Sequence, residues 1–217
     1  MKNIPRIFVG DDVRANAVMP VSRDVAHYLS RVMRTPNCLV FGGGREFDAY
    51  LSEDEKNLIV GNQTAHPDPS GNVTLYFAPI KRCDDLINMA TQMGVAAFQP
   101  VITQRTTAQH INWSRMEKIA IEAAEQSNRN SVPKIMPPVK FSELNLHGIV
   151  FADERAAYGA QRVAGAASKS VLVGPEGGFS DAEFTALDAA GAIGISLGAT
   201  ILRAELAAAI AVSRVTQ

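Results

Sequence analysis

The stretch that decides the fold is residues 171–215, which read VLVGPEGGFSDAEFTALDAAGAIGISLGATILRAELAAAIAVSRV. Two short apolar segments, 171–173 and 194–197, have the character of buried strands, and each runs into a glycine-bearing turn. Turns of this kind gather at the carboxyl ends of parallel strands, where α/β proteins bind ligands. Glycine lets main-chain groups approach a ligand that a Cβ would hold away. The sequence therefore predicts a binding site built from these two turns.

A helix is expected after each turn. Ser180 and Glu183 have capping-box spacing, which predicts a helix over residues 181–190. A last, alanine-rich helix is expected to begin at Arg203, where a basic residue opposes the helix dipole. We therefore expect a partner for Arg203, which could be an anion, RNA or, in the purely structural alternative, Glu176.

The sequence upstream divides at a breaker-rich linker, residues 66–72. The part before it, residues 1–70, is β-rich, with strands at 7–9, 38–41, 46–51 and 57–60, a helix at 22–33, and Gly42, Gly43 and Gly44 as a hairpin tip. The part after it, residues 71–217, alternates strands and helices, as a parallel α/β sheet does. Its strands are expected at 73–77, 97–101 and 149–152, the last followed by Asp153 and Glu154, and its helices at 84–93 and 114–127, the second with a capping box of Ser114 and Glu117.

Composition and charge limit the class of protein. The chain has 217 residues, is 47% hydrophobic and 20% charged, and lacks an apolar run long enough for a membrane span or a signal-peptide core. A cytoplasmic location is the expectation. The net charge is −1, and residues 1–70 hold 8 of the 21 basic and 9 of the 22 acidic residues, so any RNA contact must use a local cluster. Cys38 and Cys83 lack metal-ligand spacing, and no metal is expected.

Four blocks of the sequence carry a specific pattern. The most specific is the pair VGPEGGFSDAEF (173–184) with SLGATILRAELA (196–207). The others are IPRIFV (4–9) with AHYLSRVMR (26–34), INMATQMGVAAFQPVITQRT (87–106) and IAIEAAEQSNRNSVPKIMPP (119–138). Together they resemble the RsmE family of the SPOUT superfamily, which methylates uridine N3 in 16S ribosomal RNA. The nucleotide-binding patterns G-x-G-x-x-G and Walker A are absent, which disfavours a nicotinamide-dependent oxidoreductase.

The resemblance implies a PUA-like RNA-binding domain at residues 1–70 and a SPOUT methyltransferase domain at residues 71–217, with a parallel sheet and a deep trefoil knot. It also implies a homodimer acting on 16S rRNA in the small ribosomal subunit, with S-adenosyl-L-methionine as cofactor. The residues that it assigns to cofactor binding are Val173, Gly174, Glu176, Gly177, Leu197, Gly198, Ile201 and Leu202.

The chemistry of the reaction suggests roles for further residues. Uridine N3 lies on the Watson–Crick edge and carries a proton, so the base must be unpaired and must lose that proton before it attacks a methyl group. Arg203 is expected to stabilise the developing negative charge, and Glu205 to orient Arg203 or accept a proton. Arginine suits phosphate and base contacts. The residues expected to position RNA are Arg6, Arg31, Arg34, Arg105, Gln126 and Arg129.

Several positions depart from the family's usual pattern and keep alternatives open. Family members usually have lysine and glutamate at Met89 and Gln92, and proline and arginine at Ala199 and Thr200. Threonines usually stand at Ala204 and Leu206. One alternative is a SPOUT methyltransferase that acts on another RNA nucleotide. The other is a non-catalytic, RNA-binding ribosome assembly factor.

Overall fold

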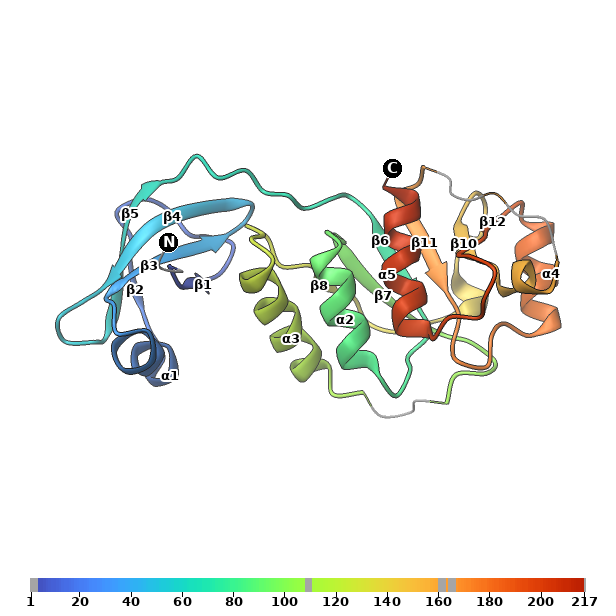
Figure 1. The fold of residues 1–217 in the computed structure, drawn as a ribbon, viewed down its shortest axis with the longest axis horizontal. Helices are drawn as coiled ribbons and strands as arrows, with labels where there is room; N and C mark the ends of the chain where they lie inside the picture. The colour runs from blue at the N-terminus through green and yellow to red at the C-terminus, as the bar shows by residue number, and fades with distance from the viewer. Residues whose placement is uncertain (1–3, 108–110, 160–162, 164–166, 217) are drawn as a thin grey trace. The chain divides into compact units, whose positions relative to one another are not determined.

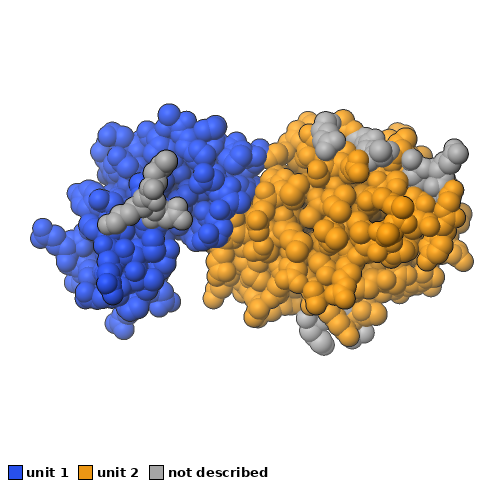
Figure 2. Space-filling view, viewed as in Figure 1, with its two compact units in different colours: residues 1–70, 124–132 blue, residues 71–123, 133–217 orange. Residues whose placement is uncertain are grey.

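The computed structural model describes residues 4–107, 111–159, 163 and 167–216. The chain forms two compact units, residues 1–70 with 124–132 and residues 71–123 with 133–217, coloured separately in Figure 2. The first boundary falls at Ser70, at the end of the first domain expected from the sequence. Residues 124–132, which the sequence analysis placed in the second domain, belong to the first unit.

The first unit is built on one twisted sheet, with the strand order β1-β3-β4-β5-β2. β1 pairs with β3 in parallel, and the remaining neighbours are antiparallel. Gly43 and Gly44 have φ values of +56° and +77°, so the predicted glycine turn does join β3 to β4. The short edge strand β2, which ends in a proline, was not predicted. The strands are β1 (Arg6–Phe8), β2 (Val18–Pro20), β3 (Asn37–Gly42), β4 (Arg45–Leu51) and β5 (Asn57–Gln63).

The helix predicted at residues 22–33 is shorter and changes its winding. α1 (Arg23–His27) begins after Ser22, whose hydroxyl accepts a hydrogen bond from the Val25 N–H at 3.3 Å. The chain then continues as the π-helix η1 (Tyr28–Met33) and stops at Arg34, in the left-handed region with φ +51°. The Ser30 hydroxyl donates to the Ala26 carbonyl, a bond of the kind that bends helices.

The second unit is built on a parallel sheet in the order β12-β10-β11-β6-β7-β8, with β9 also pairing with β7 (Figure 1). The predicted α/β fold, a parallel sheet beside a separate β-rich domain, is confirmed. Its central strands are buried on both faces and read as continuous apolar runs. The strands are β6 (Thr74–Phe77), β7 (Ala97–Ile102), β8 (Lys134–Ile135), β9 (Val139–Lys140), β10 (Val150–Ala152), β11 (Ser170–Val173) and β12 (Ile193–Ile195).

Helices and short 3-10 segments connect these strands. α5 packs on α2 and on β11, and its buried alanines allow this close approach. The capping box predicted for α4 is present, because the Ser180 hydroxyl accepts from the Glu183 N–H and the Glu183 carboxylate accepts from the Ser180 N–H. The helices are α2 (Cys83–Gln92), α3 (Trp113–Gln126), α4 (Asp181–Ala189) and α5 (Ala204–Val215), and the 3-10 segments are η2 (Phe141–Glu143) and η3 (Glu154–Tyr158).

The start of α3 differs from its prediction. Asn112 rather than Ser114 caps the helix, since its side-chain oxygen accepts from the Arg115 N–H at 3.1 Å and the helix begins at Trp113. Serine and asparagine are both good N-caps, so spacing alone chose the wrong one. Among the described residues, no helix combines the length and the apolar character that crossing a membrane requires.

Candidate active site

A cavity of about 580 Å³ opens at the carboxyl ends of β10, β11 and β12 in the second unit. Three loops wall it: one after β10, the GPEGG loop after β11, and the loop from β12 to α5. Every residue that the sequence analysis assigned to cofactor binding lines this cavity. Those residues are Val173, Gly174, Glu176, Gly177, Leu197, Gly198, Ile201 and Leu202.

The GPEGG loop is held tightly against its neighbours. A Cβ at Gly174 would lie 3.2 Å from the Phe179 ring. Gly178 has φ +68°, and a Cβ there would collide with the Glu154 carboxylate. The Arg105 guanidinium, from the loop after β7, donates from Nη1 to the carbonyls of Gly177 and Phe179 at 2.9 and 3.1 Å. Arg105 therefore lines the cavity and also braces the loop.

Gly178→Ala is expected to distort this loop and weaken ligand binding in the cavity by about 10-fold or more, since small displacements of binding groups have large effects. The control is Gly191→Ala, where φ is +70° but no atom lies within 4 Å of the added Cβ. Both variants carry left-handed strain, so both are expected to lose stability. Titration calorimetry with S-adenosylmethionine, the cofactor expected from the sequence, measures the affinity, and thermal melts measure the stability. An equal loss of affinity in both variants would contradict the role of the close contact at Gly178.

The loop from β12 to α5 brings Arg203 to the cavity. β12 ends at Ile195, earlier than the predicted residue 197, and Gly198 has φ +135°. The chain then runs without regular structure to Arg203, which is exposed, lines the cavity and forms the N-cap of α5. The carboxylate of Glu176, expected as a possible partner of Arg203, accepts instead from the Lys81 N–H at 3.4 Å.

Glu205 lies elsewhere than expected. Its side chain is 8% exposed and forms an ion pair with Arg82, with Oε1 3.6 Å from Nη1. Arg82 also pairs with Asp85 in α2, so the two pairs link the start of α2 to the start of α5. Glu205 is not among the described residues that line the cavity.

The loop after β10 forms the third wall, and its organisation was missed from the sequence. The Arg155 guanidinium bonds the carboxylates of Asp153 and Asp188 at 2.7 and 2.9 Å and lies over the Phe184 ring at 4.1 Å. Bonds to Asp188 and Asp153 raise the pKa of Arg155, so the guanidinium stays charged. Glu154 accepts from the Phe179 N–H at 3.2 Å, and burial raises the pKa of its carboxyl. The signal available in the sequence was the charged run Asp153-Glu154-Arg155, directly after a buried strand.

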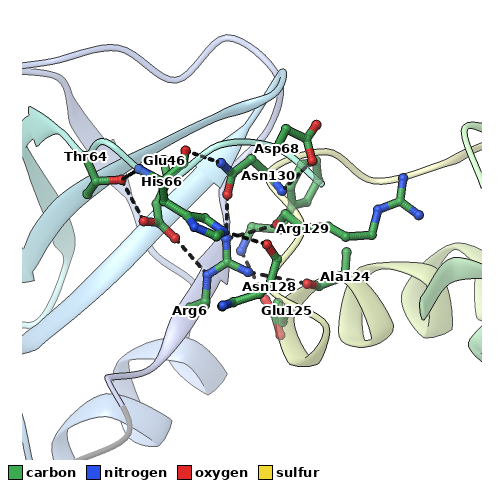
Figure 3. Close-up of polar contacts among 11 residues, drawn as sticks. Arg6, Glu46, Thr64, His66, Asp68, Ala124, Glu125, Asn128, Arg129 and Asn130 are labelled. Atoms are coloured by element: carbon green, nitrogen blue, oxygen red, sulfur yellow. Dashed lines mark hydrogen bonds and ion pairs between the residues drawn. The ribbon is translucent and has the colours of Figure 1, made fainter. Parts of the chain in front are cut away.

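Two arginines assigned to RNA lie inside the first unit (Figure 3). Arg6 is ion-paired with Glu46 at 2.9 Å, donates to Asn130 Oδ1 at 2.7 Å and to the Arg129 carbonyl at 3.0 Å, and lies over the Phe41 ring. Arg129 is 2% exposed, and its Nε donates to the Ser70 hydroxyl at 2.9 Å. Desolvation lowers the pKa of Arg129. Both side chains therefore hold residues 124–132 in the first unit, a correction to their expected place on an RNA-facing surface.

The remaining residues assigned to RNA are exposed. Arg31 pairs only loosely with Glu55, at 3.8 Å, and Arg34 and Gln126 also lie at the surface. The structure thus brings Arg203 and Arg105 together at the cavity, whereas Arg31, Arg34 and Gln126 belong to the first unit.

The sequence of this chain also matches a known protein family. Residues 66–216 match the family described as RNA methyltransferase domain, so this part of the chain is an RNA methyltransferase domain. The chain is 32% identical to the ribosomal RNA small subunit methyltransferase E of Rickettsia conorii, over 97% of this chain and 94% of the relative. It is 29% identical to the protein of the same name from Synechocystis, over 97% and 76%. The chain belongs to the ribosomal RNA small subunit methyltransferase E family.

Solved structures agree with this assignment. The ribosomal RNA small subunit methyltransferase E of Neisseria gonorrhoeae, crystallised with S-adenosyl methionine, superposes with a TM-score of 0.80 at 26% identity. The match covers 97% of this chain and 96% of that one. The fold therefore extends over nearly the whole chain. The trefoil knot stays a prediction.

Proposed function

We propose that this protein transfers the methyl group of S-adenosylmethionine to N3 of a uridine in the 16S ribosomal RNA of the small subunit. The observation that carries the proposal is the cavity, where the two glycine loops of the family signature meet at the carboxyl ends of the strands. The family and the S-adenosylmethionine complex of the relative from Neisseria gonorrhoeae support the cofactor and the class of reaction. The cytoplasm is the proposed location.

The residues of the cavity fit S-adenosylmethionine. A volume of about 580 Å³ lies within the usual range of small-molecule sites, roughly 300–1,000 Å³. Side chains at positions 174 and 178 would disturb Phe179 and Glu154, so the loop presents bare backbone there. Val173, Leu197 and Leu202 add apolar wall for a flat base. Bound S-adenosylmethionine would supply an electrophilic methyl carbon on a sulfonium centre.

Arg203 is the residue proposed to act on the base. Methylation at N3 requires the uridine to give up its N3 proton, which leaves negative charge on the ring and its carbonyl oxygens. An exposed guanidinium at the rim of the cavity can donate to one of those oxygens and stabilise that charge. Glu205 is proposed to act indirectly, because its ion pair with Arg82 fixes the first turn of α5 next to Arg203.

RNA positioning is proposed for the exposed members of the expected set. Arg105 lies at the cavity, and Arg31, Arg34 and Gln126 lie on the surface of the first unit. That unit is the proposed PUA-like, RNA-binding domain. Because the whole chain carries a net charge of −1, the three local arginines rather than a general positive field would contact the phosphates, and Gln126 could add a neutral hydrogen bond.

A homodimer is also proposed. Four alanines of α5, Ala204, Ala207, Ala208 and Ala211, are buried within the protomer and are not available for a dimer surface. Exposed apolar side chains on α5 and the neighbouring α2 are Leu206, Met89 and Met93, 39–44% exposed.

Leu206→Glu is expected to shift the protein from dimer to monomer in light scattering after size exclusion. Val163→Glu, at an exposed apolar residue outside these helices, is the control, and a monomeric wild type would contradict the proposal.

The test of function is methyl transfer from labelled S-adenosylmethionine to small ribosomal subunits that lack N3-methyluridine. The RNA is then digested and its nucleosides are identified by mass spectrometry. The expected product is 3-methyluridine. A different methylated nucleoside would show that the enzyme acts on another nucleotide. Cofactor binding without any methyl transfer would favour a non-catalytic RNA-binding assembly factor.

A further inference from the structure

Glu154 occupies a distinctive place in the cavity wall. It is the first residue of η3, separated from β10 by Asp153 alone, and is partly buried. Its Oε1 accepts from the Phe179 N–H at 3.2 Å, and the same oxygen fills the space where a side chain at Gly178 would begin. The carboxylate is therefore lodged under the GPEGG loop while it lines the cavity.

The charge of Glu154 has no cationic partner among the ion pairs of the described residues. Arg155, next in sequence, directs its guanidinium to Asp153 and Asp188 instead. Burial is the first cause of the raised pKa of Glu154, and Asp153 adds to it, whereas the Phe179 N–H and the charge of Arg155 oppose it. A desolvated carboxylate in this condition is stabilised by any cation that enters beside it.

We propose that Glu154 is the counter-charge for the positively charged part of the bound cofactor. This inference rests on the proposed function, because S-adenosylmethionine is the ligand that brings the charge. Its methionine portion carries two cationic groups, the sulfonium and the α-ammonium. A partly buried carboxylate in the wall would attract either group more strongly than a fully exposed one, since solvent screens it less.

The other acidic residues of the cavity are less suited to this role. Glu176 and Asp181 are exposed, so water screens their charges. Asp153 is buried, but Arg155 already neutralises it. Glu154 is thus the one acidic lining residue, within the described chain, that is at least partly buried and not ion-paired.

The two cationic groups can be told apart by the reaction product. S-adenosylhomocysteine keeps the ammonium but has a neutral thioether in place of the sulfonium. If Glu154 faces the sulfonium, it favours cofactor over product and so assists product release. If it faces the ammonium, it binds both ligands equally.

The decisive variant is Glu154→Gln, which keeps the shape and can still accept from the Phe179 N–H, so that only the charge is lost. Titration calorimetry with S-adenosylmethionine and with S-adenosylhomocysteine would compare it with the wild type. Loss of a charged interaction predicts that Glu154→Gln binds S-adenosylmethionine about 10-fold more weakly or worse. Unchanged affinity for S-adenosylhomocysteine would assign the sulfonium, and an equal loss would assign the ammonium.

The matched control is Glu183→Gln. Glu183 is buried and, like Glu154, accepts from backbone N–H groups, those of Gln104 and Ser180, but it does not line the cavity. Its variant is expected to lose stability and to keep cofactor affinity within about 3-fold of the wild type. Wild-type affinity in Glu154→Gln, or an equal loss in both variants, would overturn the inference. A wild-type protein that binds no S-adenosylmethionine would instead overturn the proposed function.

Discussion

Arg203→Ala is expected to lower the turnover number for methyl transfer by about 100-fold or more, the usual effect of removing a donor to a developing oxyanion. Cofactor affinity should stay within a few-fold of the wild type, because the cavity is walled largely by backbone and apolar groups that the substitution leaves in place. Single-turnover kinetics on small subunits, together with calorimetric cofactor binding, would measure both quantities.

Two further variants sharpen this test. Arg203→Lys keeps the charge but loses the planar fork of donors, so it should recover only part of the rate. Arg214→Ala, in the last turn of α5 and outside the cavity lining, should keep wild-type turnover. If Arg203→Ala retained near-wild-type turnover, Arg203 would have no electrostatic role in the reaction.

Arg6→Ala is expected to destabilise the first unit by about 3–5 kcal/mol, since it leaves the Glu46 carboxylate buried without its cation. The side chains of Arg6 and Glu46 are 7% and 4% exposed, so water cannot replace the lost partner. The variant also removes donors to Asn130 and to the Arg129 carbonyl. Urea denaturation, followed by a probe in the first unit, would measure the free energy of unfolding.

The control for this prediction is Arg31→Ala, which removes an exposed ion pair with Glu55 at 3.8 Å. A surface pair of this kind contributes less than about 1 kcal/mol, so the free energy of unfolding should hardly change. Equal small effects of the two substitutions would show that the Arg6 pair does not stabilise the unit.

The core of the site could be predicted because its signal is local. The glycines of the GPEGG loop, the capping box of Ser180 and Glu183, and the apolar strand before them are all read within a dozen residues. A turn that needs glycine and a helix that needs a cap leave a signature wherever they occur. The α/β order followed from the same kind of periodicity.

The partners of charged side chains could not be predicted in this way. Glu205 was expected to orient Arg203 or accept a proton, but its partner is Arg82, the N-cap of α2, more than a hundred residues earlier. From the sequence alone, Arg6 was expected at the surface. In the structure, residues 124–132 belong to the first unit and bury it. Such pairs depend on which segments the tertiary fold brings together, and sequence spacing does not encode that for a single chain.

The return of residues 124–132 to the first unit has a consequence for synthesis of the chain. The contacts of Asn130 with Arg6 and His66 cannot form until Asn130 has been made, about 60 residues after the linker. At roughly 5–20 residues per second, that is a wait of roughly 3–12 s during which the amino-terminal unit lacks the contacts of residues 124–132. Completion of the amino-terminal unit is therefore paced by translation of residues 71–132, which follow its last strand.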